Sequence, residues 1–166
     1  CLMARRLLEA GVRFVQIMNK PHNPWDHHGD LANRLPETAA ATDRPSAALI
    51  RDLERRGLLD DTIVLWIGEF GRLPTSQGGS GRDHNMHAFT ALVSGGGFKA
   101  GHIHGATDEV GYKAVEDKVS VLDLLATILN QLGLDHRQLT YQHNNLEVSL
   151  TDAKVSQANV VRRLLV

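Results

Sequence analysis

Residues 62–68, TIVLWIG, constrain the fold more than any other stretch, because they make a near-continuous apolar run. Such a run is typical of a β-strand that is buried on both faces, as in a parallel sheet covered by helices. The segments VRFVQIM (12–18) and AFTALVS (88–94) have the apolar and β-branched content of further strands. These three segments are therefore predicted to lie in one parallel or mostly parallel sheet.

Other segments have the apolar spacing of helices. A short helix is expected to end at Gly11, a long one to span 38–56, and a third to span 121–132 before Gly133. Pro45 either kinks the long helix or starts a second segment at that point. The third helix should bury one apolar face against the sheet, formed by Leu122, Leu125, Ile128 and Leu129.

This alternation of helices and strands predicts an α/β architecture, with residues 1–166 as a single domain whose mostly parallel sheet is covered by helices. A strand–turn–strand unit is expected within 102–121, and a short hairpin and a terminal helix in the last thirty residues. The formal net charge of −1 gives no reason to expect nucleic acid or a membrane surface as a partner. No apolar run approaches the roughly 18 residues of a membrane-spanning helix.

The chain begins at Cys1, inside a stretch that already has a helical pattern. We therefore expect it to be the C-terminal part of a longer protein, whose export signal and N-terminal catalytic groups would lie outside these residues. Cys1 is the only cysteine, so no disulfide can form within the chain.

Histidines and acidic residues gather where the predicted strands end. The segment PHNPWDHHGD (21–30) follows the first strand, Glu69 follows the second, and Asp83, His84 and His87 lie in the next loop. Ligands of open α/β sheets bind outside the carboxyl ends of the strands. Imidazole and carboxylate together suit zinc, manganese or iron. The clusters thus predict a divalent metal site, although a solvated loop and surface ion pairs would have the same composition.

Four side chains are expected to converge in one cleft as metal ligands: Asp26, His28, Glu69 and His84. His22 should lie outside that cleft. His27 should point away from it, because adjacent residues of an extended segment face opposite sides.

A series of motifs resembles the DUF1501 family: GEFGRLP, GRDH, GGGFKAG, GATDEVG and VLDLLATILNQLGLD, in this order. These are bacterial proteins of the sulfatase and alkaline-phosphatase-like superfamily. The resemblance implies an alkaline-phosphatase-like fold, a two-metal site at the carboxyl edge of the sheet, and an extracytoplasmic (periplasmic) location through an export signal.

The resemblance also implies roles for particular residues. Asp26 and His28 match the aspartate and histidine that bind one ion, and His84 matches a later histidine that binds the same ion. Glu69 and Phe70 stand where an Asp-His pair would bind the second ion, and Phe70 cannot ligate a metal. The spacing of Asp26 and His28 is tighter than in the superfamily, which makes His27 a rival ligand. The superfamily's nucleophile has no match in this chain.

The resemblance implies that the protein is a metal-dependent hydrolase of phosphate or sulfate esters. Its substrate would be a small anionic ester, and its metal zinc, manganese or calcium. Arg72 or Arg82 would then stabilise the anionic transition state, since a planar guanidinium matches such oxyanions. The alternative is a non-catalytic metal- or ligand-binding module derived from the same fold. A third possibility is a structural remnant that holds no metal. The oligomeric state stays open.

Overall fold

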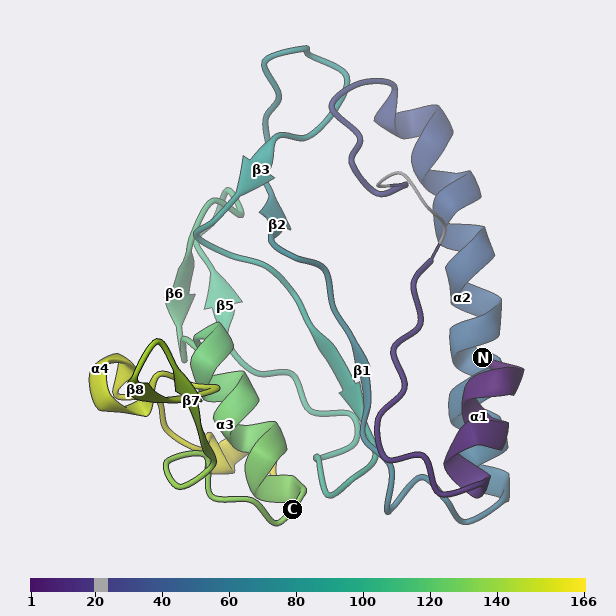
Figure 1. The fold of residues 1–166 in the computed structure, drawn as a ribbon. Helices are drawn as coiled ribbons and strands as arrows, with labels where there is room; N and C mark the ends of the chain where they lie inside the picture. The colour runs from purple at the N-terminus through teal and green to yellow at the C-terminus, as the bar shows by residue number, and fades with distance from the viewer. Residues whose placement is uncertain (20–23) are drawn as a thin grey trace.

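The computed structural model describes residues 1–19 and 24–166. Figure 1 shows an open arrangement in which α2 runs along one side, and α3 and the last strands gather on the other. The helices and strands of the described residues are α1 (Leu2–Glu9), α2 (Leu31–Arg55), β1 (Val64–Trp66), β2 (Gly71–Arg72), β3 (His84–Asn85), β4 (Leu92–Ser94), β5 (Ala106–Thr107), β6 (Ala114–Glu116), α3 (Val121–Gln131), β7 (Thr140–His143), β8 (Leu146–Ser149), α4 (Ala153–Ser156) and a 3-10 helix (Arg162–Leu164).

The predicted mostly parallel sheet was wrong. The described strands form two-stranded antiparallel sheets, namely β1 with β4, β2 with β3, β5 with β6, and β7 with β8. Two of the three predicted strands do pair, since Trp66 lies opposite Leu92, but they run antiparallel. Residues 12–18 form no strand. A strand needs a neighbour for its backbone groups, and this segment has none among the described residues.

The expected burial of the apolar run was also wrong. Leu65 is 37% exposed and Trp66 is 41% exposed. The described structure has an accessible surface of 11907 Å², whereas a compact protein of this length exposes about 8,000 Å². The covering layers that the apolar run requires are therefore not supplied by the described residues, and much of the apolar sequence lies at the surface.

The long helix was found but its start was misplaced. α2 begins at Leu31, not at residue 38, and continues through both Pro36 and Pro45. A proline inside a helix removes one backbone hydrogen bond. The hydroxyl of Thr42 donates to the carbonyl of Thr38 at 3.1 Å, and the hydroxyl of Ser46 donates to that of Thr42 at 2.7 Å. These bonds lie along the same stretch of the helix and tie its side chains to its backbone.

The short N-terminal helix packs against the end of α2. The guanidinium of Arg5 donates to the carboxylate of Asp52 at 2.9 Å, and Arg56 bridges Asp52 and Glu9 at 2.9 and 3.1 Å. Gly11 has a φ of +89° just beyond α1. The prediction that the first helix ends at this glycine is therefore confirmed, and the positive φ is the reason that glycine suits the position.

The third helix was predicted at nearly its observed bounds, but its buried face was not. A capping box starts it, because the Ser120 hydroxyl accepts from the Asp123 amide and the Asp123 carboxylate accepts from the Ser120 amide. Gly133, with φ +75°, follows the last turn as predicted. The buried side chains are Leu124, Ala126 and Thr127. Leu125 is 36% exposed. The face of α3 that is buried is therefore rotated about the helix axis from the face that was predicted to be buried.

The two predicted strand–turn–strand units are present as β5–β6 and β7–β8. The last predicted element, a terminal helix, is reduced to the single turn of α4 and the 3-10 helix. None of the helices in the described part of the chain combines the length and the apolar character that crossing a membrane requires.

Candidate metal centre

The site lies where the segment before α2 meets the β2–β3 pair. β2 and β3 pair so that Arg72 lies opposite His84. Paired residues of an antiparallel ladder project their side chains on the same side of it. The pairing therefore brings the side chains of Arg72 and His84 to one place.

The loop between β2 and β3 is fastened to the segment that precedes α2. The amide of Arg82 donates to the carbonyl of His27 at 2.9 Å, and the amide of Leu31 donates to the carbonyl of Ser80 at 2.9 Å. A Cβ atom on Gly81 would lie 2.1 Å from the carbonyl carbon of His28. Only glycine allows this approach of the two backbones, and the approach sets the position of His28 relative to His84.

Three of the four predicted ligands converge in this place. The Asp26 Oδ1 atom lies 3.0 Å from His84 Nε2 and 3.0 Å from His28 Nε2. The two Nε2 atoms lie 3.1 Å from each other. Asp26 is half-buried, while His28 and His84 are exposed. The side chains thus form a small triangle of ligand atoms that is open to solvent.

Arg72 holds the carboxylate of Asp26 in its charged form. The Nη1 atom of Arg72 donates to Asp26 Oδ1 at 2.6 Å. Hydrogen bonds from Arg72 first and His84 second lower the pKa of Asp26 to about 2. Asp26 is therefore an anion at any physiological pH and can serve as a ligand without losing a proton.

Two residues that were not among the predicted ligands, Asp83 and Phe70, complete the site. The carboxylate of Asp83 lies 3.0 Å from His28 Nδ1. The Gln77 backbone amide first, and His28 second, lower the pKa of Asp83. The ring of Phe70 packs on that of His84 with centroids 4.2 Å apart, and the Arg72 guanidinium lies 5.3 Å from the Phe70 centroid. Phe70 thus supports both a candidate ligand and the arginine beside it.

The sequence did contain a signal for these roles, but an ambiguous one. Asp83 lies between Arg82 and His84 in the sequence, and a surface ion pair between Arg82 and Asp83 would fit the same pattern. The actual partner of Asp83, His28, is 55 residues away. Only the pairing of the two segments in space reveals that contact.

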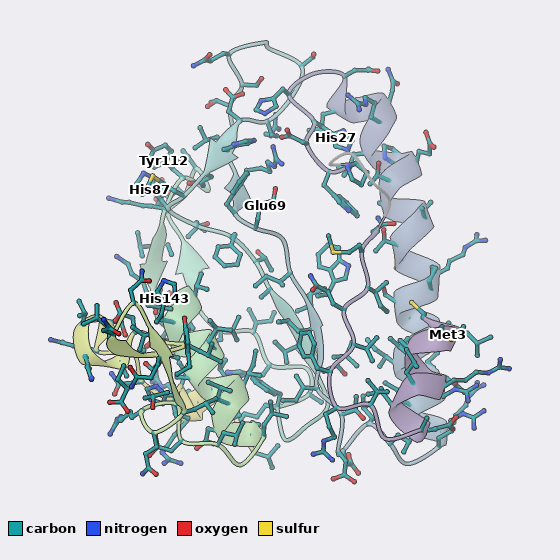
Figure 2. All side chains as sticks on the ribbon, viewed as in Figure 1. Met3, His27, Glu69, His87, Tyr112 and His143 are labelled. Atoms are coloured by element: carbon teal, nitrogen blue, oxygen red, sulfur yellow. The ribbon has the colours of Figure 1, made fainter. Side chains whose placement is uncertain are left out.

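The other predicted site residues lie apart from the triangle. The Glu69 carboxylate, whose side chain is 66% exposed, comes within 3.9 Å of Arg72 Nη2 and is not among the converging ligands. Arg82 is exposed and donates from Nη1 to the carbonyl of Gly81. His87 packs against Tyr112, with ring centroids 5.5 Å apart (Figure 2).

Of the two histidines that were expected to lie away from the ligands, His27 is within the described residues and His22 is not. His27 is 2% exposed, is not among the converging ligands, and its ring nitrogens have no hydrogen-bond partner among the described residues. Burial lowers the pKa of His27, so the ring is favoured in its neutral form. The expectation that His22 lies outside the cleft concerns a residue outside the described ranges.

The three converging atoms fit a divalent transition-metal ion. Ligand atoms about 2.1 Å from one ion lie about 3.0 Å apart at a right angle and about 3.4 Å apart in a tetrahedron. The observed separations of 3.0, 3.0 and 3.1 Å match the right-angled set. Two imidazoles and one carboxylate suit zinc, iron or manganese. They suit calcium less, because calcium takes oxygen ligands.

Comparison with known proteins identifies the family. The sequence profile of the family described as "Protein of unknown function (DUF1501)" matches residues 1–165. The chain belongs to this family. No curated protein matches the chain, and no solved structure matches it. The site of this DUF1501 protein therefore has to be interpreted from its own geometry.

Proposed function

We propose that this DUF1501 chain binds one divalent transition-metal ion through Asp26, His28 and His84, as part of a hydrolase of phosphate or sulfate esters. The observation that carries the proposal is the mutual approach of the three ligand atoms to within 3.1 Å. The three belong to two separate segments of the chain, which a merely solvated histidine loop would not require.

The neighbouring residues have roles that suit such a site. A divalent ion supplies Lewis-acid polarisation of an ester oxygen and makes water more acidic. Asp26 contributes the negative charge of the ligand set. Arg72, 2.6 Å from Asp26, carries a guanidinium within reach of an anionic ester group bound beside the ligands. Phe70 holds the His84 ring from one side.

The proposal is for one ion rather than two. Glu69, the expected ligand of a second ion, has an exposed carboxylate that does not join the other three. Membership of the sulfatase and alkaline-phosphatase-like superfamily is part of the proposal, supported by the order of Asp26, His28 and His84 along the chain. The departure at Phe70 agrees with a single ion.

A specific observation favours a second candidate, a non-catalytic metal-binding module. Among the described residues, no hydroxyl or thiol group hydrogen-bonds to the side chains of Asp26, His28 or His84. The nearby Ser80 hydroxyl accepts from the amide of Asp30 instead. Water would therefore have to be the nucleophile in any hydrolysis that these residues perform.

The experiment separates the two candidates. The chain is dialysed against zinc or manganese, its metal content is measured, and turnover of p-nitrophenyl phosphate and p-nitrophenyl sulfate is followed. One ion per chain with turnover that His84→Ala abolishes supports the hydrolase, with His102→Ala as the control at an exposed histidine elsewhere. One ion without turnover supports the binding module. No bound ion contradicts both.

A further inference from the structure

The carboxylate of Asp83 connects the β2–β3 loop to the candidate metal centre. One oxygen, Oδ1, lies 3.0 Å from His28 Nδ1. The other, Oδ2, accepts from the backbone amide of Gln77 at 2.8 Å. Asp83 is not one of the converging ligands, so its carboxylate faces the outer nitrogen of a ligand rather than the ligand triangle.

The position of this carboxylate is fixed by the backbone around it. The Asp83 carbonyl accepts from the amide of Leu73 at 2.7 Å, and the Asp83 amide donates to the carbonyl of Thr75 at 3.3 Å. Together with the hydrogen bond from the Gln77 amide, these contacts hold both the backbone and the carboxylate of Asp83 in place. The acceptor that faces His28 is therefore preorganised, and the more exposed imidazole adapts to it.

The chemistry of the contact determines where the imidazole proton lies. An ionised carboxylate can only accept a hydrogen bond, so His28 Nδ1 has to donate. In a neutral ring the other nitrogen, Nε2, then carries a lone pair. That lone pair faces His84 Nε2 at 3.1 Å, which can donate to it. Asp26 Oδ1 also lies 3.0 Å from His28 Nε2, but it accepts from Arg72 Nη1 and His84 Nε2 instead.

We infer that Asp83 is a positioning residue that fixes the neutral His28 ring in its Nδ1–H tautomer and directs the Nε2 lone pair into the candidate metal centre. The consequence for metal affinity rests on the proposed function, whereas the tautomer is a property of the chain alone. A carboxylate behind a histidine ligand fixes its tautomer and orientation in many metal sites, and its loss typically lowers metal affinity by about 10–100-fold.

The tautomer is tested by NMR on the metal-free chain with ¹⁵N-labelled histidine. Long-range ¹H–¹⁵N correlations at pH 8 distinguish a protonated Nδ1 from a protonated Nε2 in a neutral ring. We expect His28 to be protonated at Nδ1 in the wild type. Asp83→Ala should shift the ring toward the Nε2–H form, while Asp61→Ala, the loss of an exposed acid elsewhere, should leave it unchanged.

A second variant guards against a general loss of structure. Asp83→Asn keeps one acceptor oxygen for two donors, His28 and Gln77, and should give a mixture of tautomers. The backbone amide spectrum of each variant shows whether the fold persists. A wild-type ring protonated at Nε2, or an unchanged Nδ1–H ring in both folded variants, would overturn the inference.

Zinc titration of the same variants tests the consequence. We expect Asp83→Ala to weaken zinc binding by about 10–100-fold while one ion per chain is retained at saturation. If the tautomer changes but no chain binds zinc, the positioning role stands and the proposed metal function fails. If zinc binds with equal affinity to the wild type and both variants, Asp83 does not position a ligand.

Discussion

Gly81→Ala should disrupt the candidate metal centre without altering any ligand. The added Cβ would lie 2.1 Å from the carbonyl carbon of His28, 2.2 Å from its oxygen and 2.5 Å from the carbonyl oxygen of His27. These are backbone atoms, so no side chain can rotate away to make room. Ordinary contact requires about 3.5 Å, and the two segments must therefore separate by more than about 1 Å.

The magnitude follows from what that separation breaks. Overpacking of this kind typically costs about 1–3 kcal/mol. The bond from the Arg82 amide to the His27 carbonyl, now 2.9 Å, would lengthen as well, and such a bond contributes about 0.5–1.5 kcal/mol. Metal ligands must sit within about 0.2 Å of their places. We expect an unfolding free energy lower by about 1.5–4.5 kcal/mol and zinc affinity reduced at least about tenfold.

The assays are urea denaturation for stability and calorimetric titration with zinc for affinity. Gly68→Ala is the matched control, because a Cβ there would meet its nearest atom at 3.7 Å. The control should change neither quantity beyond the ordinary cost of a surface substitution, about 0.5 kcal/mol. A Gly81→Ala chain with wild-type stability and wild-type zinc affinity would show that the two segments are not in this close contact.

Three further predictions concern the core, the acid dependence and the ligand set. Leu53→Ala, at a fully buried position in α2, should cost about 2–5 kcal/mol, whereas Phe14→Ala, at a side chain that is 80% exposed, should cost under about 0.5 kcal/mol in urea denaturation. The stabilisation from ionised Asp26 is present above its ordinary pKa of 3.8 and is lost as the pH falls toward about 2. Between these pH values the melting temperature of the wild type should therefore fall more than that of Asp26→Asn. Glu69→Gln should leave zinc affinity within about threefold in calorimetry, because an exposed pair contributes under about 1 kcal/mol; a larger loss would place Glu69 among the ligands.

Local patterns predicted several local features of this chain. The glycine stop after α1, the extent of α3 and both later hairpins follow from signals that lie within a few residues of each element. The sheet could not be predicted in the same way. The apolar run at 62–68 was interpreted as a strand covered on both faces, but burial depends on neighbours that the described residues do not supply. The strand direction depends on pairing between distant segments, which no local pattern specifies.

The candidate site shows the same division between local and distant information. The expected strand ends and the residue types selected Asp26, His28 and His84 as metal ligands, and the structure places these three together. The strand expected at 12–18, before Asp26 and His28, is nevertheless absent. Glu69 has the same type of position, but its side chain is directed to solvent and toward Arg72. The contact of Asp83 with His28 depends on the approach of two backbones at Gly81, which a single sequence does not reveal.

The most direct test of the central claim is anomalous diffraction from crystals of the chain soaked in zinc or manganese. The account predicts one anomalous peak per chain, within about 2.0–2.2 Å of Asp26 Oδ1, His28 Nε2 and His84 Nε2. The same soak of His84→Ala crystals should give no peak at that place. A wild-type map without a peak among these three atoms at saturating metal, or with the metal bound elsewhere only, would contradict the account.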